Sequence, residues 1–460
     1  MARRVLIAFR STQANNIRMK RFSLSAVVGV LLLPLILSAQ TVKDREGAIR
    51  NDRKQMTGNA RWIYNDIDAG FAEAQRSGKP LMVILRCVPC MACMGIDTEV
   101  LTENADLKPL MDQFVRVRVI NANALDLSRF QFDYDLSFST LFFNGDGTTY
   151  GRYGSWEHQH DSQNRATATY RDALRAALEL HQNYPANRKS LAGKQGRPFP
   201  YKRPVEMPIL SGKYDLDLNW RGNVVKSCVH CHQIGDSIRL DHRSRKEAIP
   251  TKWIYPYPTL AALGFEMDEH DLLKVKKIES ASVAANSGLQ VGDRITAIDG
   301  QVPISTADVS WALHHAPDKG LLKVKVLRSG REINTGLRLP AGWRTKTDIA
   351  RRVGTWPMRA MAFGGMFLID LTDAERQERG LPLTGMALRA KHVGQYGKHA
   401  GAKRQGFIKE DVIVALNGQT ARVSESELLG KLISGHKAGA KLPATVLRKG
   451  KRLNLKLPIQ

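Results

Sequence analysis

Cysteine is scarce in this sequence, and long apolar runs are missing from most of it. Five cysteines among 460 residues are too few for a scaffold held together by disulfides. Hydrophobic residues make up 43% of the chain and charged residues 25%, which excludes wholesale disorder, collagen and a protein with many membrane spans. Because domains commonly hold about 100–200 residues, the length predicts about three or four of them.

Acidic residues are also in short supply. The chain has 44 Asp and Glu against 69 Lys and Arg, for a formal net charge of +25. A basic surface attracts acidic partners such as anionic lipid, phosphate-bearing polymers or nucleic acid. The sequence contains no Walker loop, no zinc-finger spacing and no aromatic-basic RNA motif, so nucleic acid is the least favoured of these partners.

The first 39 residues lack acidic side chains altogether. Met19-Lys20-Arg21 precedes an apolar run from Leu24 to Leu37, whose 14 residues fall short of the roughly 20 that a membrane span needs. Small residues follow at Ser38 and Ala39. This order predicts a secretory signal cleaved after Ala39, with an N-terminal extension of residues 1–18. An uncleaved anchor is the alternative. We therefore expect an exported protein of the periplasm or cell envelope, where disulfides persist.

The five cysteines form two tight clusters, and the first lies in a segment of alternating helix and strand patterns. Helical spacing ends at Gly78, and an apolar run that is typical of a buried strand follows. The predicted helices cover residues 67–75 and 171–181, and the predicted strands cover residues 81–85, 114–119 and 140–143. The first cluster, Cys87, Cys90 and Cys93, follows the first of these strands directly.

A strand that leads into Cys-x-x-Cys at the start of a helix favours redox chemistry. The helix N-terminus carries partial positive charge and free N–H groups, and both stabilise a thiolate. The first cysteine can then attack a disulfide, and the second, one turn later, releases the partner. A metal cluster and inert cysteines are the alternatives.

This stretch resembles the thioredoxin superfamily, in particular its exported branch with Lys79-Pro80, a strand and then the motif. By its spacing from Lys79-Pro80, the resemblance implies that Cys90 is the nucleophile and Cys93 the resolving cysteine, with Cys87 a third thiol within reach. The competing pair is Cys87-Val88-Pro89-Cys90, which has the proline familiar in the family. The family places a cis-proline opposite these cysteines. Ser139 occupies that place here, and a cis bond before a residue other than proline costs about 3 kcal/mol, so we expect a trans bond and a reshaped groove.

The second cluster is Cys228-Val229-His230-Cys231-His232. The pattern C-x-x-C-H is typical of c-type haem attachment. Cys228 and Cys231 would form the thioethers, and His232 would be the proximal ligand of the haem iron. A second disulfide pair and a zinc site are the alternatives. Candidates for the sixth iron ligand are Met207, Met267, His230, His242 and His270.

An internal repeat occupies the C-terminal part of the chain. Residues 287–301 match residues 405–419 at six of fifteen positions. Near its end each copy has a turn sequence, Asp-Gly in the first and Asn-Gly in the second. The pattern resembles the PDZ domains of bacterial envelope proteins. Such domains bind the C-terminus of a peptide as an added strand, with the carboxylate held by backbone N–H groups. Leu263, Gly264 and Phe265 fit the carboxylate-binding loop of the first copy.

The order of these parts resembles exported bacterial thioredoxin-like/PDZ domain-containing (seleno)proteins. We expect a multidomain α/β and α+β protein, in which a thioredoxin-like fold is followed by a short haem-motif segment and two PDZ-like domains. The predicted boundaries are 1–39 for the signal, 40–184 for the thioredoxin-like domain, 185–258 for a linker with the haem motif, 259–340 for the first PDZ domain, and 341–460 for a connecting segment and the second.

The functional hypothesis is an exported thiol-disulfide and electron-transfer protein. It would combine the Cys87, Cys90 and Cys93 site with a covalent c-type haem and hold protein or peptide C-termini on its PDZ domains. Its other partners would be a redox protein and anionic components of the envelope. The alternative is a non-catalytic PDZ scaffold or peptide-binding protein with structural cysteines. A serine protease is disfavoured, because the sequence has no G-x-S-x-G stretch.

Overall fold

A computed structural model of the chain describes residues 44–89, 94–102, 104–154 and 163–460. The predicted secretion signal lies outside these residues, as do Cys90 and Cys93. None of the helices in the described part of the chain is long and apolar enough to cross a membrane.

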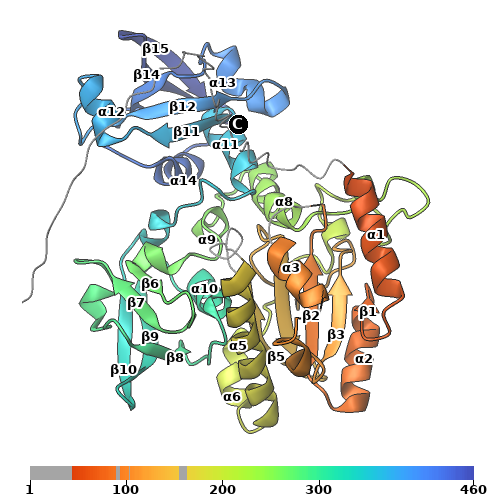
Figure 1. Cartoon of the computed structure of the whole chain (residues 1–460). Coiled ribbons are helices and arrows are strands. Elements are labelled where there is room, and N and C mark those ends of the chain that lie inside the picture. The colour runs from red at the N-terminus through yellow and green to blue at the C-terminus, as the bar shows by residue number, and fades with distance from the viewer. Residues whose placement is uncertain (1–43, 90–93, 103, 155–162) are drawn as a thin grey trace, which may run out of the picture. The chain divides into compact units, whose positions relative to one another are not determined.

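The N-terminal part is built around a five-stranded mixed sheet with the strand order β1-β3-β2-β4-β5 (Figure 1). The three strands β1, β3 and β2 run parallel, whereas β4 and β5 continue the sheet antiparallel. The strands are β1 (Ile63–Tyr64), β2 (Leu81–Arg86), β3 (Val115–Val119), β4 (Phe138–Phe143) and β5 (Thr149–Tyr153). The helices are α1 (Arg45–Thr57), α2 (Ile67–Ser77), α3 (Met94–Leu101), α4 (Lys108–Met111), α5 (Gln163–Gln182) and α6 (Arg188–Leu191).

The predicted helices and strands of this part agree with the structure to within a few residues at most of their ends. The helix α2 ends where Gly78 adopts a left-handed backbone with φ +67°, as the Gly-Lys-Pro pattern predicts. The strand β2 is buried along its whole length, which matches its unbroken apolar run. The helix α5 begins eight residues before the predicted start, at Gln163.

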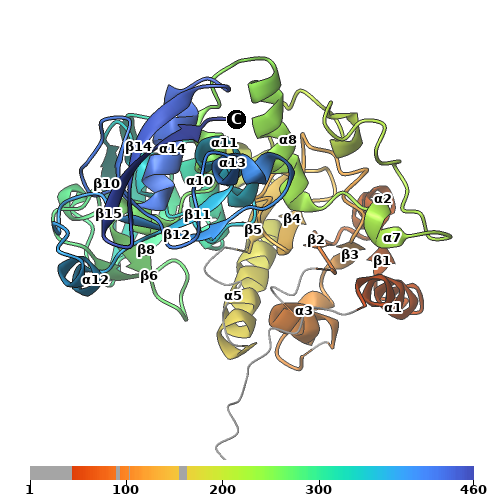
Figure 2. The same ribbon diagram turned by 90° about the horizontal axis from the view of Figure 1, so that it is seen from above.

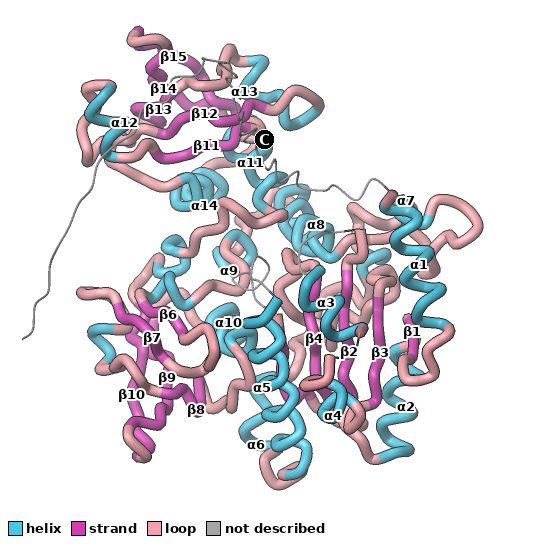
Figure 3. The backbone as a smooth tube through the Cα atoms, in the orientation of Figure 1, coloured by secondary structure: helices cyan, strands magenta, loops and turns pink. Residues whose placement is uncertain are grey.

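Alternate residues of β2 point into two separate cores, because successive side chains of a strand face opposite sides of the sheet. Met82 and Ile84 pack with side chains of α3 and α5 on one face. Figure 3 shows the two helices on the same side of the sheet. Leu81, Val83 and Leu85 pack on the other face with α2 and with the loop that follows β3.

The segment between the thioredoxin-like part and the first PDZ domain belongs to this second core. Its helices are α7 (Val224–Ser227), α8 (Cys231–Ser244) and α9 (Thr251–Ile254). Ile234 and Ile238 of α8 pack in the same core as β2, and so do Met207 and Leu210 of the predicted linker. The helix α7 packs beside α1 (Figure 2). The predicted linker is therefore an ordered segment that covers one face of the sheet.

The next part has the small strands and single main helix of a PDZ fold. Its strands are β6 (Phe265–Met267), β7 (Val275–Ile278), β8 (Arg294–Ile298), β9 (Gly320–Arg328) and β10 (Arg331–Leu339), and its helix is α10 (Thr306–His315).

The C-terminal part forms one five-stranded sheet with the order β11-β12-β13-β14-β15. Its elements are α11 (Thr355–Phe363), β11 (Met366–Asp370), α12 (Asp373–Glu378), β12 (Leu388–Val393), α13 (Gly401–Arg404), β13 (Val412–Leu416), α14 (Glu425–Gly435), β14 (Lys441–Arg448) and β15 (Lys451–Pro458).

The two copies of the internal repeat share their local geometry. In the first copy Arg328 pairs with Asp293 at 2.7 Å and donates to the carbonyl of Gly288. In the second copy Arg448 pairs with Asp411 at 2.7 Å and donates to the carbonyl of Gly406. Both copies carry a bulge in the same place, after Ile295 in β8 and after Ile413 in β13. The two copies of the repeat therefore share the structure around this ion pair and bulge, although their strands are arranged in different sheets.

Candidate functional site

Cys87 is the first residue after β2, at the edge of the sheet where the carboxyl ends of the parallel strands meet. Leu85 pairs with Val119, so β2 and β3 end side by side. The backbone N–H of Cys87 donates to the carbonyl of Ser137 at 2.9 Å, which holds the start of the motif against the residue that precedes β4. Sites in sheets of this kind form at the carboxyl ends of the parallel strands.

A buried network of charges fixes the helix that follows the motif. Asp97 in the first turn of α3 accepts from Arg86 at 2.9 Å and from Arg118 at 2.7 Å. Arg118 also pairs with Asp52 of α1 at 2.6 Å. Burial by itself would raise the pKa of Asp97, but the two guanidinium groups outweigh it and hold that pKa below its ordinary value. The network ties α3 and α1 to the ends of β2 and β3.

The second cysteine motif is anchored to the same edge of the sheet by Asn123, which is 0% exposed. The Asn123 side chain accepts from the backbone N–H of Val229 at 2.7 Å. Its amide group donates to the carbonyls of Asp215 and Ser227. Asn123 follows β3, so a loop at the end of one strand positions the start of α8.

The helix α8 begins inside the motif. His230 is its N-cap, and the His230 backbone N–H donates to the side chain of Gln233 at 2.7 Å. Cys231 is therefore the first residue of a 14-residue helix. The ring of His232 stacks on that of His230 with centroids 5.7 Å apart. Burial raises the pKa of Asp236, one turn after His232, and the opposing effects of Arg239 and His232 do not outweigh it.

The two cysteine motifs meet at one cavity. The Sγ of Cys87 lies 3.2 Å from Nδ1 of His230, a contact between residues 143 positions apart. Cys228 and Cys231 line the same cavity and are 7% and 8% exposed. The apolar side chains around the cysteines include Ile49, Leu85, Val119, Ile120 and Leu218.

The structure thus brings together three of the predicted site residues, Cys87, Cys228 and Cys231. Cys90 and Cys93 lie outside the described residues, so their roles stay predictions. Sequence reasoning missed Asn123 and Asp97, and it weighed His230 only as an iron ligand. An asparagine or aspartate of this kind has no recognisable spacing, because its partners come from distant parts of the chain.

The residues of the C-x-x-C-H motif do not accommodate a haem as they are packed here. The cavity that Cys228 and Cys231 face has a volume of about 10 Å³, which is about the space of one water molecule. A porphyrin is many times larger, so the walls formed by the Cys87 loop and Leu218 would have to separate. Among the described residues, no group of three or more His, Cys, Asp or Glu side chains is arranged to hold a metal ion. Covalent haem at Cys228, Cys231 and His232 stays an untested prediction.

The predicted carboxylate-binding loop lies before the edge strand β6. Leu263 and Phe265 are buried in the core of the first PDZ domain. Gly264 between them has φ +81°, and a Cβ there would lie 2.1 Å from that of Ser282, so glycine is required. In the described part of the chain β6 pairs only with β7, on one of its two edges.

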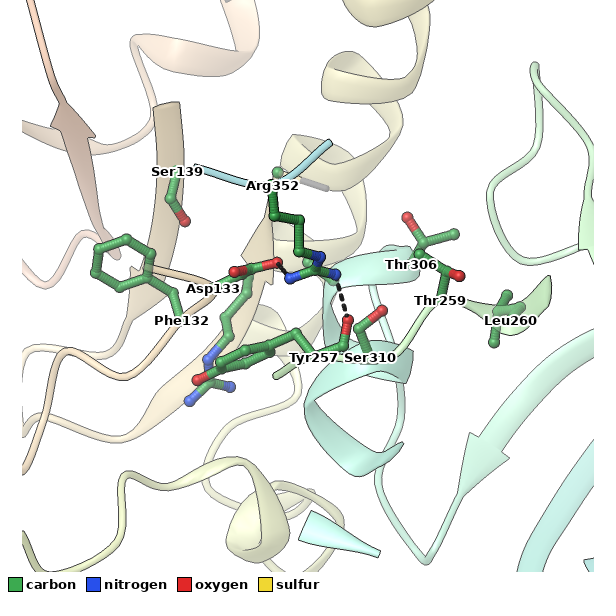
Figure 4. A pocket seen from close by; sticks show the side chains of 12 residues that line it. Phe132, Asp133, Ser139, Tyr257, Thr259, Leu260, Thr306, Ser310 and Arg352 are labelled. Carbon is green, nitrogen blue, oxygen red and sulfur yellow. Dashed lines mark hydrogen bonds and ion pairs between the residues drawn. The ribbon is translucent and has the colours of Figure 1, made fainter. Parts of the chain in front are cut away.

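A second cavity lies between the thioredoxin-like part and the first PDZ domain (Figure 4). Arg352 extends into it, donating to Asp133 at 2.7 Å and to the carbonyl of Tyr257 at 3.0 Å. Burial raises the pKa of Asp133 to about 6, although Arg352 opposes the shift. Ser139 also lines this cavity. The one cis peptide bond among the described residues precedes Pro185, so the bond before Ser139 is trans.

The helix α10 of the first PDZ domain joins the same boundary. Asp308 accepts from the backbone N–H of Arg152 at 3.1 Å and from Lys194 at 2.9 Å. The indole N–H of Trp311 donates to the carbonyl of Gly193. One face of α10 is therefore a docking surface for the thioredoxin-like part, and its other face packs in the PDZ core through Val309 and Leu313.

Comparison with known proteins identifies the parts of the chain. No curated protein matches it. The HtrA-type protease AlgW with a tripeptide is 25% identical over 20% of this chain and 29% of that chain, with a TM-score of 0.17. AlgW S227A with a decapeptide is 17% identical over 40% of this chain and 53% of that chain, with a TM-score of 0.22.

A serine endoprotease from Yersinia pestis is 16% identical over 37% of this chain and 52% of that chain, with a TM-score of 0.17. The chain covers less than two thirds of each of these proteases. The family described as thioredoxin-like matches residues 62–145, and the family described as PDZ domain matches residues 261–339. The chain therefore contains a thioredoxin-like domain and, after it, a PDZ domain.

Proposed function

We propose that the protein carries out thiol-disulfide exchange. The observation that supports this function best is the position of Cys87, which follows the buried strand β2 at the carboxyl edge of a thioredoxin-like sheet. The cysteines of the motif then precede α3, whose first turn is held by the buried network around Asp97. A cysteine placed before a helix N-terminus is stabilised as the thiolate, which is the nucleophile in such exchange.

The exchange follows from the order of the cysteines. The Cys90 thiolate attacks a disulfide of the partner protein, forming a mixed disulfide and releasing one partner thiolate. Cys93 then attacks the Cys90 sulfur, so that the partner leaves with two thiols and the motif keeps one disulfide. The reverse sequence oxidises a partner dithiol. Because His230 lies 3.2 Å from Cys87, an imidazole N–H there can donate to the third sulfur and stabilise it as a thiolate.

A redox titration tests this function. The purified protein is equilibrated in graded ratios of oxidised and reduced dithiothreitol, and the state of Cys90 and Cys93 is read by alkylation and peptide mass spectrometry. We expect a reversible two-electron couple that Cys90→Ser abolishes. Ser77→Ala, at the exposed end of α2, is the control that keeps the couple. If Cys90→Ser titrates like the unchanged protein, exchange at this motif is refuted.

Export and covalent haem belong to the wider proposal and are tested apart from the exchange. Protein produced with a c-type haem maturation system should show a Soret band that survives acid–acetone extraction, if Cys228 and Cys231 hold haem. A colourless product, with a mass that shows both sulfurs unmodified, removes haem from the proposal and leaves the exchange reaction standing. Recovery of the chain cleaved after Ala39 from the periplasm would support export.

Peptide binding by the first PDZ domain is a second function, favoured by the open edge of β6. An added strand could pair there, next to the loop of Leu263, Gly264 and Phe265. A fluorescent peptide with an apolar C-terminal residue is the probe. We expect binding to weaken about tenfold when its carboxylate is amidated, because the backbone N–H groups lose their charged acceptor. Equal binding of both peptides would contradict recognition of a C-terminus.

A further inference from the structure

The cysteines that line the cavity come from two motifs that lie far apart in the sequence. Cys87 leaves the sheet at the end of β2, while Cys228 and Cys231 are held at the start of α8 by Asn123. Cys87 and His230, which are in contact at 3.2 Å, both line this cavity. The fold therefore brings a second Cys-x-x-Cys pair to the same cavity as Cys87.

The second pair has the local arrangement of a redox pair. Its two cysteines are separated by two residues, and Cys231 is the first residue of α8, where the helix has backbone N–H groups without partners within the helix. A thiolate at this position is stabilised by the helix N-terminus. Cys228 lies outside the helix, with its sulfur 3.6 Å from the carbonyl of Ile120. The two sulfurs are thus unequal, and Cys231 is the better leaving group of a disulfide between them.

Burial limits which thiols can reach this pair. Cys228 and Cys231 are 7% and 8% exposed, and Cys228 packs among Ile49, Ile120 and Leu218. Cys87 is only half-buried and lines the same cavity. A dissolved thiol has little access to the buried pair, whereas Cys87 lines the same cavity. Cys87 is therefore the more accessible of the three cysteines at this cavity.

We propose that Cys228 and Cys231 form a second redox pair that exchanges its disulfide with Cys87. This rests on the proposed thiol-disulfide function and adds an internal partner to it. The Cys87 thiol gives its proton to solvent, and the thiolate attacks Cys228. The Cys228–Cys231 bond breaks, a Cys87–Cys228 bond forms, and Cys231 leaves as a thiolate, with no net change in the number of disulfides. A thiol of a partner protein can then attack Cys87, which leaves the buried pair reduced.

The proposal and haem attachment exclude each other. Thioethers to a haem would consume both sulfurs, so neither could form a disulfide. The packing described here is compatible with exchange between cysteines that line one small cavity, which has a volume of only about 10 Å³. It would have to open widely to admit a porphyrin.

Trapping of the mixed disulfide is the direct test. The full chain with Cys231→Ser is oxidised with oxidised dithiothreitol and digested without reduction, and linked peptides are quantified by mass spectrometry. We expect Cys87–Cys228 to be the main linkage of Cys228. The matched variant Cys228→Ser should give several-fold less Cys87–Cys231, because the buried sulfur at the helix start is the leaving group. Absence of a link to Cys87 in both variants overturns the proposal, and equal yields overturn the assignment of the attacked sulfur.

A second measurement leaves the buried pair intact. In the oxidised chain, the rate at which reduced dithiothreitol opens the Cys228–Cys231 disulfide should fall about tenfold in Cys87→Ser, since the direct route is shielded. Val88→Ala, which alters the same cavity without removing a sulfur, is the control and should keep the rate. An unchanged rate in Cys87→Ser overturns the proposal. The Cys90 and Cys93 couple, titrated in the same samples, shows independently whether the exchange function itself stands.

Discussion

The contact between Cys87 and His230 is the residue-scale feature that most affects reactivity. The sulfur and Nδ1 are 3.2 Å apart, so an imidazole N–H can donate to the thiolate and stabilise it. Replacing His230 with Phe removes the donor and keeps a ring of similar size. We expect the alkylation of Cys87 by iodoacetamide to slow several-fold, measured by peptide mass spectrometry at constant pH.

His242, in the last turn of α8, provides the control for this experiment. His242 contacts Glu247 at 3.1 Å and lies at the other end of the helix, so His242→Phe should leave the alkylation rate of Cys87 unchanged. If both variants slow the reaction equally, the effect comes from a general change in α8. A Cys87 rate that is unaffected in His230→Phe would show that the imidazole does not stabilise the sulfur.

At the scale of elements, the buried network around Asp97 holds the first turn of α3 against β2 and β3. Asp97→Asn would leave Arg86 and Arg118 buried with one fewer carboxylate, at a cost of about 3–5 kcal/mol in the free energy of unfolding. The midpoint of urea unfolding measures this loss. Asp172→Asn, which removes an exposed carboxylate paired with Arg175, should cost less than about 1 kcal/mol. Similar losses in both variants would contradict the importance of the buried network.

The same network predicts a dependence of stability on pH. The pKa of Asp97 in the folded protein lies below its ordinary value of 3.8, because its ion pairs with Arg118 and Arg86 outweigh the effect of burial. The unfolded state therefore binds the proton more readily. The contribution of Asp97 to stability is fully present above about pH 4 and is lost as the pH falls through the lowered pKa. Between pH 5 and pH 3, the free energy of unfolding should therefore fall less in the Asp97→Asn variant than in the unchanged protein.

Local patterns predicted the elements near the site, whereas the site itself depends on contacts between distant elements. The apolar run of β2 and the break at Gly78 are determined by neighbouring residues, and both were predicted correctly. The contact of Cys87 with His230 spans 143 positions, and no spacing rule connects the two. The segment 185–258 was predicted to be a linker with the haem motif. Met207 and Leu210 of this segment are nevertheless buried in the core beside β2, and partly buried aromatic side chains such as Phe199 and Tyr201 pack against the same core.

At the scale of the whole chain, Arg352 connects the segment after the first PDZ domain to the thioredoxin-like part. It pairs with Asp133 and donates to the carbonyl of Tyr257, while the backbone N–H of Gly354 donates to Asp135 at 3.0 Å. A buried carboxylate that loses its partner is costly, so Arg352→Met should lower the free energy of unfolding by about 3–5 kcal/mol at pH 8. Arg351→Met, at the exposed neighbouring position, is the control and should change it by less than about 1 kcal/mol.

The loss of stability in Arg352→Met should itself vary with pH. This dependence distinguishes an electrostatic role of Arg352 from a role in packing alone. The pKa of Asp133 in the folded chain is about 6, above its ordinary value of 3.8, so the folded state binds the proton more tightly and stability falls as the pH rises through this range. Without Arg352 that pKa rises further, because the guanidinium no longer opposes the effect of burial. The difference in melting temperature between Arg352→Met and the unchanged protein should therefore be large at pH 8 and smaller at pH 5. A difference that stays constant across this range would show that Arg352 acts at the junction by filling space alone.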